Sequence, residues 1–168
     1  AGVGEVGEVY ASGDNIMQGY WQDPHTTADA LRDGWLHTGD LGRLDEDGYL
    51  TIEGRNSEMI KSGAYRISPV EIEEVLLKQP QVHEAGVVGV DDPILGQKIC
   101  AVVTLKPAGC ATDQELLAHC AQGLVQYKRP KSIIVVDALP KSPSGKVLRQ
   151  NLREISVRAV QSSAPATS

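Results

Sequence analysis

The spacing of hydrophobic positions divides this chain of 168 residues into two parts that meet near residue 55. In the first part, apolar and polar residues alternate over short stretches such as residues 5–11, and large apolar side chains are few. The sequence Asp-Glu-Asp-Gly at residues 45–48 separates residues 41–44 from residues 49–53, which predicts a β-hairpin. We therefore expect the first part to form short strands that do not fold independently.

A short helix is predicted between these strands. Asp23 suits the N-cap position and Pro24 suits the first helical position, directly before the stretch Ala-Asp-Ala-Leu at residues 28–31. Gly34 is a typical stop signal, so the helix is expected to end near it.

The second part, residues 59–160, contains longer apolar stretches. Residues 82–90, 98–105 and 133–136 are rich in small and β-branched apolar side chains, and each is short enough to be a buried strand. The turn sequence Asp-Asp-Pro at residues 91–93 separates the first two strands. The pattern predicts a sheet with a core of about three strands.

Helix start signals lie around these strands. Ser-Pro-Val-Glu at residues 68–71 and Thr-Asp-Gln-Glu at residues 112–115 both match the capping box, and the first helix should end before Pro80. A last helix is predicted over residues 148–160 and a disordered tail over residues 161–168.

Composition agrees with a globular α+β fold. Apolar residues make up 41% of the chain, but aromatic residues make up only 4% and Phe is absent, so the core must be mainly aliphatic. We expect a short β-strand subdomain followed by a small mixed α/β domain, with flanking helices around a roughly three-stranded core sheet.

Charge is distributed unevenly. Residues 126–158 hold eight of the 16 Lys and Arg residues and only two acids, although the net charge of the chain is −6. A basic segment at the end of an acidic chain indicates an anionic partner. Tyr127 is the one aromatic residue in this segment, so a small phosphate-bearing ligand fits better than nucleic acid. A solvated basic helix remains an alternative.

Several classes of site are disfavoured. Cys100, Cys110 and Cys120 are spaced too widely for a C-x-x-C motif, and the four histidines lack paired ligand spacing, so no metal site is expected. No apolar run approaches 18 residues and no secretory signal is seen. Reduced thiols, no membrane span and a cytoplasmic location are therefore expected.

Two glycine motifs do not predict phosphate loops. Residues 2–7 match G-x-G-x-x-G, but a strand rather than a helix follows them, so no helix N-terminus would face a pyrophosphate. Ser144-Gly145-Lys146 lacks the earlier glycine and the following Ser or Thr of a Walker loop.

Two other segments carry candidate chemistry. Residues 139–146 contain two prolines and one glycine, which predicts a stiff exposed loop that ends in Lys146. A compact ammonium held in this way suits charge on phosphate or carboxylate oxygens, although a simple surface turn is the alternative. Asp40 follows a glycine at a predicted strand end, where its carboxylate could accept two hydroxyl hydrogen bonds or cap a turn.

Three motifs then occur in the order and spacing of one family. They are Thr38-Gly39-Asp40, the run from Gly54 to Glu73, and residues 140–146 with the sequence Pro-Lys-Ser-Pro-Ser-Gly-Lys. Residues 15–21 also fit the family pattern. Over about residues 4 to 155, the chain resembles the adenylate-forming enzymes, and in particular the C-terminal portion of AMP-forming acyl-CoA synthetases.

This resemblance implies roles for the nucleotide-binding residues. Asp40 and Arg55 would bind the ribose hydroxyls of ATP and of the adenylate. Lys146 would be the catalytic residue that bridges the carboxylate and phosphate oxygens during adenylation. Ser57 would lie at the hinge about which the small domain rotates, where the family commonly has Asp or Lys.

The resemblance also implies a thiol tunnel. Gly63 and Ala64 would line the tunnel for the phosphopantetheine arm, and Lys61 would lie beside it. The family often has two glycines here, so Ala64 adds one methyl group to the wall.

The implied organisation is the end of a large ATP-binding domain over residues 1–55, a hinge at 56–58 and a lid over 59–160. The implied function is that of a C-terminal fragment of an ATP-dependent carboxylic (fatty) acid–CoA ligase, which forms an acyl-adenylate and then a thioester. Its cofactors would be ATP/AMP, Mg²⁺ bound mainly by a missing N-terminal part, and coenzyme A. A small carboxylic acid and coenzyme A or a carrier-protein phosphopantetheine would be the partners. A non-catalytic lid-like module that docks a partner protein is the alternative, and the isolated fragment is expected to be inactive.

Overall fold

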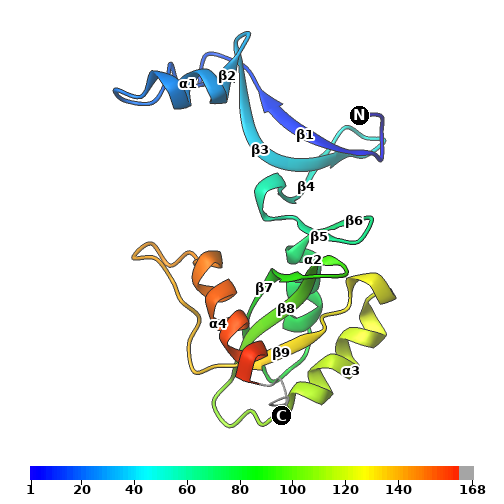
Figure 1. Cartoon of the computed structure of the whole chain (residues 1–168). Coiled ribbons are helices and arrows are strands. Elements are labelled where there is room, and N and C mark those ends of the chain that lie inside the picture. Colours follow the sequence, from blue (N-terminus) through cyan, green and yellow to red (C-terminus); the bar gives the residue numbers. More distant parts are fainter. Residues whose placement is uncertain (163–168) are drawn as a thin grey trace. The chain divides into compact units, whose positions relative to one another are not determined.

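The computed structural model describes residues 1–162 of the chain. It divides into two compact units, Ala1–Ser57 and Glu58–Ser168 (Figure 1). Most of the tail that was predicted to be disordered lies outside the described residues, and residues 161 and 162 instead end a helix, α4 (Arg149–Ser162).

The first unit is an antiparallel sheet built around the long strand β3 (Trp35–Leu44). The strands that pair with β3 are β1 (Val6–Ala11), β2 (Leu31–Arg32) and β4 (Leu50–Arg55). β3 and β4 form the predicted hairpin. Asp45 Oδ1 accepts the backbone N–H groups of Asp47 at 3.0 Å and Tyr49 at 2.8 Å, which closes the turn between them.

Helix α1 (Pro24–Ala30) begins as predicted but ends earlier. Asp23 Oδ1 accepts the N–H of Thr26 at 2.9 Å, so it is the N-cap. The helix stops at Ala30 rather than near Gly34 because β2 follows at once and pairs with the start of β3. Asp33 and Gly34, with φ of 51° and 81°, form the tight turn of that hairpin.

Little of the first unit is buried. Among its described residues, Leu41 is the one large hydrophobic side chain in the buried class, whereas Trp21 and Tyr49 are 89% and 72% exposed. A sheet with so little buried apolar area gains little free energy from the hydrophobic effect. This supports the expectation that the unit does not fold independently.

The second unit contains a five-stranded sheet in the order β6-β5-β8-β7, with β9 also paired to β8. Its strands are β5 (Ile60–Ser62), β6 (Tyr65–Ile67), β7 (Val82–Asp92), β8 (Gly96–Leu105) and β9 (Ser132–Val135). Strands β7, β8 and β9 are the three predicted core strands. The short β5–β6 hairpin adds the remaining two.

Helices cover both faces of this sheet. Val87 of β7 lies in a cluster with Ile72 of α2 (Pro69–Leu77), and the same cluster includes buried side chains of α3 (Asp113–Gly123). The next residue, Val88, lies in a second cluster with Leu152 of α4. Because neighbouring strand residues point to opposite faces, α2 and α3 cover one face and α4 covers the other (Figure 1).

Only one of the two predicted capping boxes forms. At α3, Thr112 Oγ1 accepts the N–H of Glu115, and the Glu115 carboxylate accepts the N–H of Thr112. At α2, Ser68 occupies the N-cap position but makes no side-chain cap hydrogen bond. Its expected partner, Glu71, instead forms an ion pair with Lys128, at 2.6 Å.

The described helices do not include one that is both long enough and apolar enough to cross a membrane.

The three cysteines differ in burial. Cys100 and Cys120 are buried free thiols, and burial raises the pKa of Cys120 to about 11. Cys110 is a free, exposed thiol.

Candidate functional site

Asp40 and Arg55 form an ion pair across two strands of the first unit. They are opposite each other in the β3–β4 register, and Arg55 Nε lies 3.1 Å from Asp40 Oδ1. The Asp40 side chain remains 28% exposed, so its second oxygen can accept further hydrogen bonds. The structure therefore brings together the two residues to which the family resemblance gives a shared ribose.

Thr38 and Gly39 fix the position of Asp40. Thr38 Oγ1 donates to the carbonyl of Val9 on β1 at 2.8 Å and accepts the N–H of Asp40 at 3.1 Å. Gly39 has a φ of 74°, which a residue with a side chain rarely adopts. The register of β3 against β4 shifts between Leu41 and Gly42, and such irregularities are common beside functional sites.

The connection between the two units is a single turn of 3₁₀ helix, η1 (Asn56–Glu58). The division of the chain into compact units falls after Ser57, which is exposed. On one side, Asn56 Nδ2 donates to Glu8 of β1 at 2.8 Å. On the other side, Glu58 accepts a hydrogen bond from Arg149 Nε at 2.8 Å. The hinge role of Ser57 stays a prediction.

Gly63 and Ala64 form the two-residue turn of the β5–β6 hairpin. Gly63 has a φ of 60°, and its N–H donates to the carbonyl of Leu95 at 2.8 Å. A Cβ atom at Gly63 would meet nothing within 4 Å, so the space beside its backbone is open. Lys61, the middle residue of β5, is exposed, and its backbone N–H donates to Gln97 Oε1 at 2.8 Å.

A pocket of about 370 Å³ opens beside Gly63. Neither Lys61 nor Ala64 is among the residues that line it. Its walls carry three cationic side chains and two stacked tyrosine rings, whose centroids are 4.1 Å apart. These side chains belong to Lys98, Arg129, Lys131, Tyr65 and Tyr127. The pocket is suited to a ligand with anionic groups and a flat ring.

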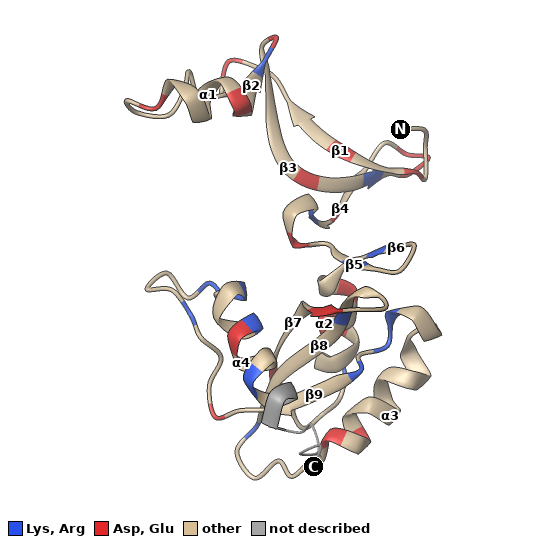
Figure 2. Cartoon of the chain, viewed as in Figure 1, with Lys and Arg blue, Asp and Glu red and all other residues tan. Residues whose placement is uncertain are grey.

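Lys146 lies near the end of a closed loop before α4. The N–H of Ser142 donates to the carbonyl of Lys146 at 2.8 Å, and Gly145, at φ 82°, makes the tight turn between them. Lys146 is exposed, and its ammonium has no acidic partner among the described residues. The loop therefore presents an uncompensated positive charge (Figure 2).

The predicted site residues belong to different parts of the chain. Asp40 and Arg55 belong to the first unit, whereas Gly63 and Lys146 belong to the second. Within the second unit, Gly63 lies on the β5–β6 hairpin and Lys146 in the loop before α4.

Residues 71–146 match the family described as the AMP-binding enzyme C-terminal domain. This segment of the chain belongs to that family. The family match covers the three core strands, the helix α3 and Lys146 at its last position.

Relatives of this AMP-binding C-terminal domain extend the similarity over most of the chain. The chain is 47% identical over 150 residues to the sulfoacetate–CoA ligase of Cupriavidus necator, covering 89% of the chain and 30% of that relative. It is 37% identical, with a TM-score of 0.84, to the o-succinylbenzoate coenzyme A synthetase of Bacillus subtilis solved with AMP, covering 91% and 31%. It is 36% identical, with a TM-score of 0.86, to the amide bond synthetase of Marinactinospora thermotolerans, covering 92% and 32%.

These comparisons confirm the predicted family and the α+β fold. The chain spans just under a third of the length of the curated relatives it matches. The individual roles of the site residues stay predictions.

The residues of the first unit fit the ribose of an adenine nucleotide. A ribose diol offers two hydroxyl donors, and the Asp40 carboxylate keeps acceptor capacity beyond its contact with Arg55. By contrast, residues 1–162 contain no group of three His, Cys, Asp or Glu side chains that could hold a metal ion.

Sequence reasoning missed the side chains that line the pocket beside Gly63. Lys98 lies on β8, and Arg129 and Lys131 lie before β9, so the three come together only through the pairing of these strands. The excess of basic residues after residue 125 was a partial signal, because it predicted an anionic partner without placing it.

Proposed function

We propose that this chain is the C-terminal part of an ATP-dependent carboxylic acid–CoA ligase. A carboxylate oxygen of the substrate attacks the α-phosphorus of ATP, the bond to pyrophosphate breaks, and an acyl-adenylate forms. The sulfur of a thiol then attacks the acyl carbon, and AMP leaves. Mg²⁺ accompanies ATP and is held mainly by parts of the ligase that precede this chain. A cytoplasmic location stays part of this proposal.

The observation that carries the proposal is the presentation of Lys146. Its loop is closed by backbone hydrogen bonds, and its ammonium has no acidic partner among the described residues. A fixed cation that is not already neutralised stabilises the negative charge that develops on the carboxylate and α-phosphate oxygens in the transition state. Asp40 and Arg55 orient the nucleotide for the same step through its ribose.

The pocket beside Gly63 supports coenzyme A as the thiol substrate. The open backbone at Gly63 suits the narrow phosphopantetheine arm, because a side chain there would narrow the passage. Lys98, Arg129 and Lys131 suit the phosphate groups at the nucleotide end of coenzyme A. Lys146 serves the first half-reaction and the thiol beside Gly63 serves the second. The second unit would therefore move as a lid between the two half-reactions, so that each acts at the same reaction centre in turn.

A different acceptor is a specific alternative, because one solved relative is an amide bond synthetase. In that case an amine would attack the acyl-adenylate, and the cationic side chains beside Gly63 would not be needed for acceptor binding. A carrier-protein phosphopantetheine is another alternative, since it shares the thiol arm but lacks the nucleotide of coenzyme A.

Pyrophosphate exchange with the full-length ligase tests the proposal. A panel of carboxylic acids, with ATP and labelled pyrophosphate, should give acid-dependent exchange for at least one class of acid. Adding coenzyme A, pantetheine or an amine to the active pair then identifies the acceptor by its product. Absence of acid-dependent exchange throughout a broad panel would favour the non-catalytic binding module.

A further inference from the structure

Arg149, the first residue of α4, contacts three separate segments of the second unit. Its Nε donates to Glu58 Oε2 at 2.8 Å, and its Nη1 donates to Glu73 Oε1 at 2.6 Å and to the carbonyl of Val87 at 2.8 Å. The side chain is only 24% exposed. Burial by itself lowers the pKa of Arg149, but the hydrogen bonds and charges of Glu73 and Glu58 outweigh it and raise the pKa overall.

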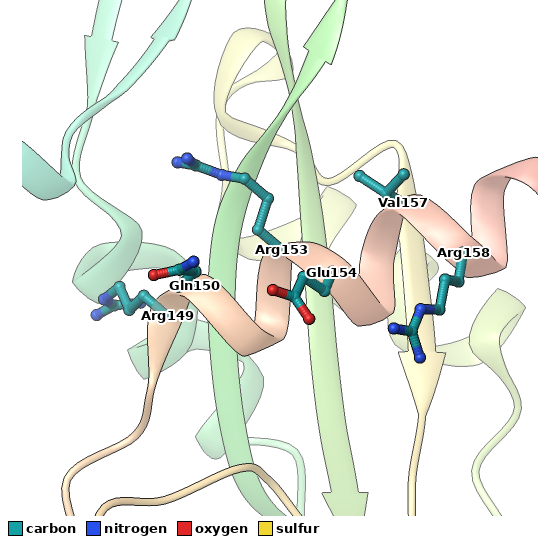
Figure 3. A pocket seen from close by; sticks show the side chains of 6 residues that line it. All are labelled: Arg149, Gln150, Arg153, Glu154, Val157 and Arg158. Carbon is teal, nitrogen blue, oxygen red and sulfur yellow. The ribbon is translucent and has the colours of Figure 1, made fainter.

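These contacts surround the free edge of β7. On its other edge β7 pairs with β8, and among the described residues no strand pairs with the free edge. Glu73 Oε1 accepts the N–H of Val87 at 2.8 Å, and Arg149 donates to the carbonyl of the same residue. The Arg149 side chain thus passes around the edge of the sheet, from α4 on one face to α2 on the other. Arg149 lies near one end of α4 and Arg158 near the other (Figure 3).

The loop that carries Lys146 is fixed at both ends to the same strand. At its start, Lys141 forms an ion pair with Glu84 of β7. At its end, Arg149, three residues after Lys146, donates a hydrogen bond to the carbonyl of Val87 of β7. The closing hydrogen bond from the N–H of Leu148 to the carbonyl of Pro140, 2.8 Å long, lies between these two anchors.

The contact with Glu58 connects this loop to the beginning of the lid. Glu58 directly follows Ser57, where the chain divides into its two units. A bidentate or forked arginine contact fixes direction as well as distance, which a lysine at the same place would not do. A cation at the first position of a helix is also unfavourable for the helix dipole, so the local helix does not explain why arginine stands here.

We propose that Arg149 is a positioning residue for Lys146 that couples the Lys146 loop to Glu58 at the exit of the hinge. The inference rests on the proposed function, because it takes Lys146 to be the adenylation lysine. When the lid turns about the hinge, the Arg149–Glu58 contact makes the loop follow as part of a rigid body. The ammonium of Lys146 then reaches the adenylation site in one defined orientation.

The test compares the two half-reactions in the full-length ligase. Arg149→Lys keeps the charge but loses the fork, and Glu58→Gln removes the negative charge that holds Arg149 Nε while leaving the contacts of Arg149 with Glu73 and Val87. Arg158→Lys is the matched control, because Arg158 is exposed on the same helix and, within residues 1–162, its side chain forms no hydrogen bond or ion pair with β7. Each variant is assayed for pyrophosphate exchange, for thioester formation from supplied acyl-adenylate, and for thermal unfolding.

We expect Arg149→Lys and Glu58→Gln to lower the rate of adenylation about 10-fold to 100-fold, with thioester formation changed less than about threefold. The double variant should lose little more than either single variant, because both weaken the same coupling. Equal losses in both half-reactions, or unchanged adenylation, would show a structural ion pair only and overturn the inference. If Arg149→Lys does not fold, Glu58→Gln decides between the same outcomes.

The Lys146→Ala variant separates this inference from the proposed function. If Lys146→Ala leaves adenylation intact, the proposed role of Lys146 fails, and the inference about Arg149 fails with it. If Lys146→Ala abolishes adenylation while Arg149→Lys and Glu58→Gln leave it intact, the proposed function stands and only the inference fails.

Discussion

Asp40 and Arg55 face each other across β3 and β4, with Arg55 Nε 3.1 Å from Asp40 Oδ1. The pair holds the Asp40 carboxylate in a fixed direction while leaving part of it exposed. A second ion pair on the same two strands, Arg43–Glu53, has the same separation of 3.1 Å. The two pairs therefore offer an internal comparison between a residue proposed to bind nucleotide and one that is not.

Substitution of Asp40 should weaken nucleotide binding in the full-length ligase. Asp40→Asn replaces one acceptor oxygen by a donor group and removes the charge that strengthens hydrogen bonds to the ribose. We expect the KM for ATP in pyrophosphate exchange to rise about 10-fold, the scale of one charge-assisted hydrogen bond. Glu53→Gln, the matched control on the neighbouring pair, should leave the KM for ATP unchanged; a similar rise in both variants would contradict the ribose assignment.

Removal of the Lys146 ammonium should affect one half-reaction selectively. Lys146→Ala should lower adenylate formation by roughly 10²-fold or more, because a fixed positive charge is lost from the transition state. Thioester formation from supplied acyl-adenylate should fall much less. Lys106→Ala, which removes an exposed lysine in the turn directly after β8, is the control. Equal losses in both half-reactions would exclude the role given to Lys146.

Local signals predicted most of the fold correctly. Proline at the start of α1 and α2, the capping box at Thr112 and the apolar stretches of β7 to β9 each depend on neighbouring residues, so the sequence displays them directly. The errors lie where pairing between segments decides. Glu71 pairs with Lys128, 57 positions away, instead of completing the cap of α2. Helix α1 ends early because the next residues, β2, pair with the start of β3.

The same contrast between local signals and pairing of separate segments applies to the candidate site. Asp40, Arg55, Gly63 and Lys146 were found because their motifs are contiguous and ordered along the chain. The pocket beside Gly63 was not predicted, because Lys98 and Lys131 come from segments that only sheet pairing brings together. Arg149 was counted only as one of many basic residues, since its partners Glu58 and Glu73 are 91 and 76 positions away in sequence.

Neutralising the cations beside Gly63 should impair binding of coenzyme A. Lys98→Gln and Lys131→Gln each remove a charge from the pocket, so the KM for coenzyme A should rise about 10-fold for the pair, more at low salt than at high salt. Pantetheine, which has the thiol arm but no nucleotide, should show no change in KM. Pyrophosphate exchange should be unaffected. An equal rise for coenzyme A and pantetheine would place the effect on the tunnel rather than on the phosphates.

The packing of α4 against β7 can be tested without any assay of activity. A Cβ atom built at Gly86 would lie 2.5 Å from Leu152 Cδ1, and Leu152 is fully buried. Gly86→Ala should therefore force α4 away from the sheet and lower the free energy of unfolding by about 1–3 kcal/mol, measured by urea denaturation of the chain. Leu152→Ala should cost about 2–5 kcal/mol by leaving a cavity. Because the added methyl group occupies part of that cavity, the double variant should lose less than the sum of the two. Strict additivity would mean that the two side chains do not share this space.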